Sequence, residues 1–155
     1  MPFSLRASGI VGVAALVTSM ALAVPASADQ AFHTQRIPLS AVADAPLKSG
    51  AVIDIHAQGP TIYAQERYVL VGAAPGTTYQ VTLLVYSDPA CAALLFPVPT
   101  VTLTTNAAGN AHGKATFYPQ DVEGLPRTTY YIDWQISVQS GAVAYSTGCI
   151  PVVLD

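Results

Sequence analysis

Two stretches of this chain alternate between two kinds of side chain, and this pattern constrains the fold more than any other feature of the sequence. In residues 130–138, Tyr, Ile, Trp, Ile and Val occupy every second position, and residues 78–86 alternate in the same way. Because successive side chains of a strand point to opposite faces, a period of two indicates β-strands with one buried face. No segment of ten residues beyond position 30 shows the 3.6-residue period of a helix. The sequence therefore predicts an all-β protein.

Turn-forming residues divide the chain from residue 51 onward into short strands. Pro75-Gly76, the Asn-Ala-Ala-Gly-Asn segment at 106–110 and Ser140-Gly141 have the composition of turns. We expect roughly seven to nine antiparallel strands with turns at short, regular intervals, which is typical of a β-sandwich. The expected strands are residues 51–57, 63–71, 78–86, 100–105, 111–118, 130–138, 143–147 and 150–154, with an edge strand at 36–42 and a loop at 88–99.

The same alternation predicts the core. In residues 51–57, Ile53 and Ile55 share one face, and Asp54 and His56 share the other, which we interpret as a polar face. The side chains that we expect to be buried together are Tyr79, Val81, Leu83, Val85, Val101, Leu103, Phe117, Ile132, Trp134 and Ile136.

The first 28 residues have the layout of a Sec-type signal peptide. Arg6 supplies positive charge, residues 10–24 are an apolar run, and Ala26-Ser27-Ala28 place small residues before a cleavage site at Asp29. A membrane anchor is the alternative, but a spanning helix needs ~20 apolar residues. We expect cleavage, leaving a partly irregular N-terminal segment (residues 29–50) and a β-sandwich domain (residues 51–155) in a secreted, bacterial-type protein without a membrane span.

The mature chain is mildly acidic and poor in charge. Without residues 1–28, five basic and nine acidic side chains remain, a net charge of −4. The basic residues are scattered, so the sequence offers no stripe for nucleic acid. We therefore expect an unidentified protein or cell-surface partner, no nucleic acid and no cofactor.

The two cysteines, Cys91 and Cys149, are expected to form a disulfide bond. An exported chain is oxidised by default, and two cysteines allow one intramolecular pairing. The alternative is a pair of free thiols that act as a nucleophile or as metal ligands.

Two short segments resemble known β-sandwich families. Residues 74–83 (Ala-Pro-Gly-Thr-Thr-Tyr-Gln-Val-Thr-Leu) are similar to the entry into a late strand of fibronectin type III domains. Residues 103–111, with Phe117 following, are similar to a hairpin of bacterial Ig-like surface domains. The resemblance implies an Ig-like or fibronectin-like sandwich in which Tyr79 makes a tyrosine-corner contact, and it implies a binding or structural role by analogy.

The sequence contains no strong catalytic motif. It lacks a Gly-x-Ser-x-Gly nucleophile elbow, and its carboxylates show no spacing typical of a glycosidase. Asp54 and His56 lie two residues apart on one expected strand, where they could ligate a divalent metal with His112 from a neighbouring strand. The alternative is that Asp54 and His56 form a solvated polar face or hydrogen-bond to each other.

Three tyrosines are candidates for a ligand-binding face. Tyr86, Tyr118 and Tyr131 lie opposite the apolar face of their expected strands, where exposed tyrosines can bind sugar rings or proteins. The alternative is an ordinary β-sheet surface partly covered by loops.

These observations together predict a secreted, non-catalytic β-sandwich that serves as a binding or interaction module. One alternative is a secreted metal-binding or small hydrolytic protein that uses Asp54, His56 and His112. Another is an exported inhibitor whose disulfide-braced loop near Cys91 makes the contact.

Overall fold

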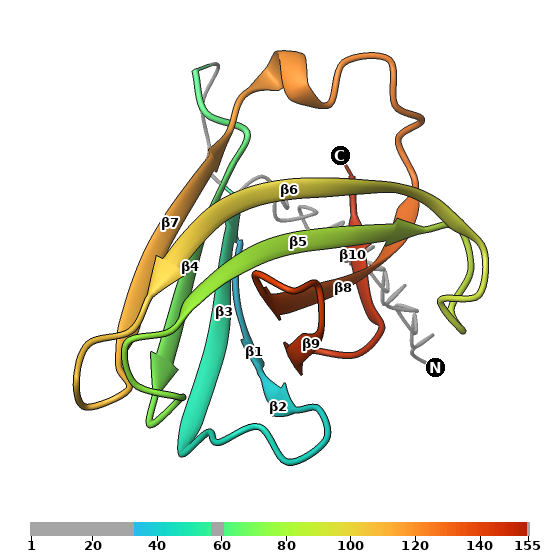
Figure 1. The fold of residues 1–155 in the computed structure, drawn as a ribbon. Coiled ribbons are helices and arrows are strands. Elements are labelled where there is room, and N and C mark those ends of the chain that lie inside the picture. Colours follow the sequence, from blue (N-terminus) through green and yellow to red (C-terminus); the bar gives the residue numbers. More distant parts are fainter. Residues whose placement is uncertain (1–32, 57–60, 155) are drawn as a thin grey trace, which may run out of the picture.

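The structure, a computed structural model, describes residues 33–56 and 61–154, and the regular elements of this part of the chain are β-strands apart from one short 3-10 helix (Figure 1). All strand pairs are antiparallel, which confirms the predicted all-β class. The elements are β1 (His33–Pro38), β2 (Ser40–Ala41), β3 (Ser49–His56), β4 (Ala64–Val71), β5 (Thr78–Tyr86), β6 (Leu94–Thr104), β7 (Ala111–Phe117), the 3-10 helix η1 (Pro119–Asp121), β8 (Thr129–Val138), β9 (Val143–Ser146) and β10 (Ile150–Val153).

These strands form two sheets that enclose a common core (Figure 1). The first sheet has the order β1-β3-β4-β7. The second has the order β2-β9-β8-β5-β6, and β10 pairs with the beginning of β8. The chain passes between the sheets after β1, β2, β4, β6 and β7. One end of the sandwich is closed by the turn between β6 and β7, and the other is spanned by the connection from β7 to β8.

The segment that precedes β3 contributes to both sheets. β1 lies at the edge of the first sheet, as the proline at its end predicts, because an edge strand tolerates a missing N–H donor. Ile37 and Leu39 are buried on either side of Pro38. β2 then pairs with β9 in the second sheet. Residues 29–32 lie outside the described part of the chain, as does the predicted signal peptide.

Most of the predicted core is confirmed. Buried side chains from both sheets meet around Trp134, and the partly buried remainder packs against them. The predicted residues that are buried are Tyr79, Val81, Leu83, Val85, Leu103, Trp134 and Ile136, while Val101, Phe117 and Ile132 are half-buried. The sequence analysis missed Ile37, Val52, Tyr68, Leu70 and Tyr145, which complete the core.

The faces of β3 are the reverse of the prediction. Asp54 and His56 are 3% and 4% exposed, whereas Ile53 and Ile55 are only half-buried. The cause is the register with β4, which places Val52 opposite Tyr68 and Asp54 opposite Glu66. Val52 is fully buried, so every second residue after it on β3 also faces inward. The polar face of this strand is therefore interior.

The expected loop at 88–99 is also partly wrong, because β6 begins at Leu94 and runs through both Pro97 and Pro99. β6 is the edge strand of the second sheet, where a proline need not donate to a neighbour. The predicted Cys91–Cys149 disulfide is confirmed, with a Cα–Cα distance of 5.9 Å. It ties the short loop after β5 to the segment between β9 and β10.

That short loop also has an internal support that the sequence analysis did not anticipate. The backbone N–H groups of Ala90, Ala92 and Ala93 donate to the Asp88 carboxylate over 2.7–3.3 Å. These bonds, led by the one from Ala93, lower the pKa of Asp88. The loop is therefore held both by its aspartate and by the disulfide.

Candidate functional site

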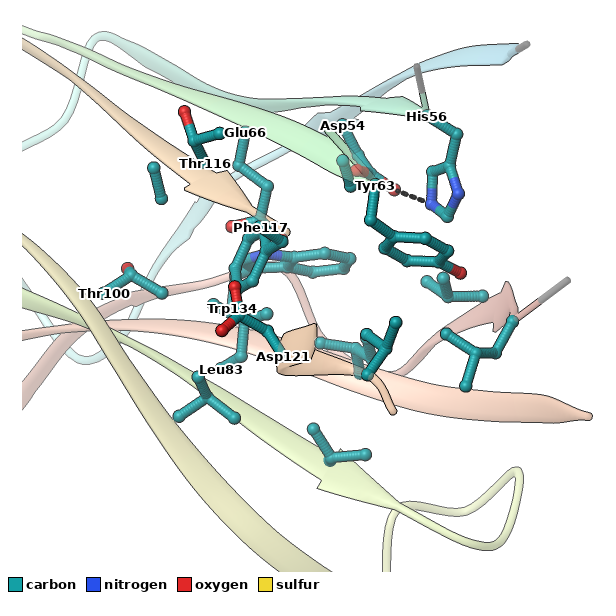
Figure 2. A pocket seen from close by; sticks show the side chains of 18 of the residues that line it. Asp54, His56, Tyr63, Glu66, Leu83, Thr100, Thr116, Phe117, Asp121 and Trp134 are labelled. Carbon is teal, nitrogen blue, oxygen red and sulfur yellow. Dashed lines mark hydrogen bonds and ion pairs between the residues drawn. The ribbon is translucent and has the colours of Figure 1, made fainter. Parts of the chain in front are cut away.

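A pocket of about 660 Å³ lies between the two sheets, at the end away from the β6–β7 turn (Figure 2). Near the turn the sheets approach closely: a Cβ added at Gly113 would come within 2.4 Å of the Leu103 side chain. Toward the other end of β7 the pocket lies between the two sheets, and Asp121 and Val122 at the end of η1 also line it. The apolar lining is formed by Leu83, Val85, Phe96, Val98, Phe117, Val122, Ile132, Val152 and Leu154.

The buried charged or titratable residues of the pocket, Asp54, His56 and Glu66, come from the inner faces of β3 and β4. His56 Nε2 lies 3.3 Å from Asp54 Oδ2, so the two side chains form a buried pair. The Tyr63 ring stands edge-on to the His56 imidazole with a centroid distance of 5.4 Å. Figure 2 shows the Asp54–His56 contact beside the Tyr63 ring. The two side chains are therefore in direct contact, and the alternative of a solvated polar face is wrong because both are buried.

Glu66 lies deeper and is fully engaged by the protein. The Trp134 indole Nε1–H donates to Glu66 Oε1 over 2.9 Å, and the Tyr68 hydroxyl is in hydrogen-bonding contact with Glu66 Oε2. Burial raises the pKa of Glu66 to about 8, because the charged form loses its hydration. Burial, with the nearby Glu66 charge, also raises the pKa of Tyr68.

Tyr68 connects Glu66 with the second sheet. A β-bulge in β6 places Thr100 beside Val81, and the Thr100 hydroxyl donates to the Val81 carbonyl oxygen over 3.3 Å. The Thr100 hydroxyl also lies 3.2 Å from the Tyr68 hydroxyl, which donates to Glu66 Oε2. A chain of contacts therefore runs from Glu66 through Tyr68 and Thr100 to the backbone of Val81.

Asp54 differs from Glu66 because only one of its two carboxylate oxygens contacts a described side chain. Its Oδ2 faces His56, whereas Oδ1 accepts no hydrogen bond from any residue that the structure describes. Asp54 lines the pocket, so Oδ1 is the acceptor that the polar end offers to a bound molecule. The hydroxyls that line the pocket belong to Tyr63, Thr100 and Thr116, and none of the described lining residues is a serine or a cysteine.

The structure does not assemble the predicted metal-ligand trio. Asp54 and His56 point inward from β3, but His112 is exposed on β7, next to the buried Ala111. The parity of β7 is set by Ala111, which places His112 on the outer face. Within residues 33–56 and 61–154, no group of three or more His, Cys, Asp or Glu side chains could hold a metal ion.

The three predicted ligand-face tyrosines are divided between two places. Tyr86 and Tyr131 are register partners on β5 and β8, and both are half-buried on the outer face of the second sheet. Partial burial, followed by the charges of Asp133 and Asp88, raises the pKa of Tyr86. Tyr118 is exposed at the start of η1. A role for these tyrosines in binding stays a prediction.

The sequence analysis missed Glu66, Tyr68 and Trp134 as members of a site. Glu66 and Tyr68 share the parity of Leu70 on β4, and all three are buried. The apolar Leu70 was the signal that could have placed Glu66 inside, because a strand that buries one residue also buries the residues two and four positions away. Trp134 was predicted for the core. Its hydrogen bond to Glu66 could not be predicted, because it depends on which strand of the first sheet faces β8.

Comparison with known proteins identifies no family: no family model, no curated protein and no solved structure matches this chain. The resemblance to fibronectin type III and bacterial Ig-like domains therefore stays a prediction. The hydroxyl of Tyr79, expected at a tyrosine corner, lies 3.1 Å from the hydroxyl of Tyr145 in the core. No helix in the described residues is long and apolar enough to cross a membrane.

Proposed function

We propose that this chain is a secreted, non-catalytic binding protein, and that its binding site is the pocket between the two sheets. The observation that carries the proposal is the pocket itself, with about 660 Å³ of space and an apolar wall surrounding a few buried polar groups. Ligand sites in proteins are typically concave, mostly apolar spaces of ~300–1,000 Å³ with a small number of convergent polar groups.

Secretion and an Ig-like or fibronectin-like sandwich are part of this proposal. The signal-peptide layout of residues 1–28 and the Cys91–Cys149 disulfide support export, since disulfides persist in oxidising compartments. The two facing antiparallel sheets support the sandwich. The proposal places the bound molecule inside the fold, whereas the sequence alone favoured a protein or surface partner on an outer face.

The proposal is tested by filling the pocket. Ala115 is half-buried on β7 and lines the pocket, so Ala115→Phe introduces a ring into the space. Ala107 is exposed in the turn between β6 and β7, and Ala107→Phe is the matched control. The probe is N-phenyl-1-naphthylamine, a neutral dye that fluoresces in apolar surroundings.

We expect saturable binding of the dye by the mature protein and by Ala107→Phe, and at least tenfold weaker binding by Ala115→Phe. Circular dichroism of both variants checks that the fold is retained. Absence of dye binding to the wild type, or equal binding by both variants, would refute the proposal.

A further inference from the structure

We infer that the pocket selects a protonated aliphatic amine carried on an apolar body, with the ammonium N–H donating to Asp54 Oδ1. The inference rests on the proposed function, because it names the chemical class of molecule that this same pocket would bind. Three observations carry it: the unengaged Asp54 oxygen, the charges that line the pocket, and the aromatic rings beside Asp54.

The first observation is the difference between the two buried carboxyl groups. Each oxygen of Glu66 already accepts a hydrogen bond from the protein, one from Trp134 and one from Tyr68. Asp54 is 3% exposed and lines the pocket, and its Oδ1 accepts no hydrogen bond from the residues that the structure describes. A buried carboxylate oxygen favours a cationic donor, because charge-assisted hydrogen bonds are roughly twice as strong as neutral ones.

The second observation is the balance of charge around the pocket. Its described lining contains the acidic side chains of Asp54, Glu66 and Asp121, together with Lys114 and His56. Burial raises the pKa of Glu66 to about 8, so Glu66 adds no negative charge at neutral pH. Lys114 and Asp121 are both exposed, where water screens their charges. A carboxylate ligand would place a second negative charge against Asp54 in a site of low dielectric. An ammonium group would instead neutralise it.

The third observation is the set of rings near the acidic end. Tyr63, Phe117 and Trp134 line the same pocket, and Figure 2 shows them gathered around the region between Asp54 and Glu66. Aromatic faces attract cations and the polarised CH₂ groups next to them. The rest of the lining is aliphatic, so it fits a hydrocarbon body attached to the amine. An arylalkylamine or alkylamine has both parts.

The test uses three probes of nearly equal shape at pH 7: 2-phenylethylamine, 2-phenylethanol and 3-phenylpropionate. Each is titrated against the mature protein with bound N-phenyl-1-naphthylamine, and displacement of the dye and emission of Trp134 are both recorded. We expect the amine to bind at least tenfold more tightly than the alcohol, and the carboxylate to bind most weakly.

Two variants carry the same chemical change at different places. Asp54→Asn should reduce the amine-to-alcohol preference to about one while leaving the affinity for the alcohol within threefold. Asp44→Asn alters an exposed carboxylate outside the pocket lining, and it should retain the preference. If Asp54→Asn does not fold, the wild-type preference among the three probes decides the question alone.

The inference would be overturned if the wild type bound the alcohol as tightly as the amine, or if Asp54→Asn kept the preference. Dye binding without displacement by any of the three probes would also overturn it, and would leave the proposed function standing. Absence of dye binding would remove both.

Discussion

The two ends of this sandwich bury tyrosine hydroxyls in different ways. At the closed end, Tyr79 lies 3.1 Å from Tyr145, whose hydroxyl donates to the Pro46 carbonyl oxygen over 2.8 Å. At the pocket end, Tyr68 connects Glu66 with Thr100. The first chain of bonds ends on a backbone carbonyl and contains no carboxyl group. The second begins at a carboxyl group.

This difference predicts that the pocket end, and not the closed end, makes the stability of the protein depend on pH. A hydrogen-bonded chain of hydroxyls and carbonyls keeps the same charge over the pH range in which proteins fold, because tyrosine ionises only near pH 10 or above. A chain that starts at a buried carboxyl group changes with pH, because its arrangement depends on one proton. The end with the responsive chain is also the end with the pocket, as expected where titratable groups with shifted pKa values gather in a cleft.

The largest expected effect comes from Trp134, which is 1% exposed and lies between the core and the pocket. Trp134→Ala removes a large buried ring and the N–H donor to Glu66, so unfolding free energy should fall by about 3–5 kcal/mol. Chemical denaturation measures it. Trp134→Phe keeps most of the apolar area and should lose less. A wild-type unfolding curve for Trp134→Ala would contradict the assignment of this residue to both regions.

Removal of the disulfide should affect both ends alike. The Cys91–Cys149 bond lies within the second sheet, and neither cysteine lines the pocket. Replacement of both with serine should lower the unfolding free energy by about 2–5 kcal/mol, because the unfolded chain regains freedom. Dye binding by the folded variant should stay within twofold of wild type. A larger loss of binding would show that the bond shapes the pocket.

The pH dependence of stability should distinguish the two ends most directly. Glu66 has a raised pKa of about 8 in the folded protein against 4.5 as the ordinary value. Between these values the unfolded chain loses the proton and the folded chain keeps it, so stability falls as pH rises, by about 1.4 kcal/mol per pH unit at most. Below pH 4.5 and above pH 8 this contribution is constant.

The measurement compares unfolding of the wild type, Glu66→Gln and Glu123→Gln from pH 4 to pH 9. Glu66→Gln should remove the decline, because the amide does not titrate. Glu123 is exposed, so Glu123→Gln should follow the wild type. The same decline in Glu66→Gln as in the wild type would show that another group is responsible.

The smallest effect is expected at the closed end. Tyr79→Phe removes one hydroxyl from the Tyr79–Tyr145 contact and should cost about 1 kcal/mol, the usual net value of a buried hydrogen bond. The loss should be equal at pH 5 and pH 8, as judged by denaturant unfolding at both. A loss that changes with pH would mean that the closed end also titrates.

Much of the fold could be predicted because the alternation in β5 and β8 is strict. Each of these strands has an apolar face of four or five residues, so a shift by one position would expose the whole set. The site could not be predicted in this way. On β3, Ile53 and Ile55 alternate with Asp54 and His56, and the more apolar set is the outer one.

The sequence by itself determined the β class, the strongest strands, most of the core and the pairing of the two cysteines, because these depend on local periodicity or on a count of residues. The tertiary structure decided which face of β3 is interior, where His112 points and that Glu66, Tyr68 and Trp134 meet. Those outcomes depend on strand register and on the sheet opposite. Trp134 and Glu66 are 68 residues apart, and the bond between them follows from how two sheets face each other, which no period within a single strand records.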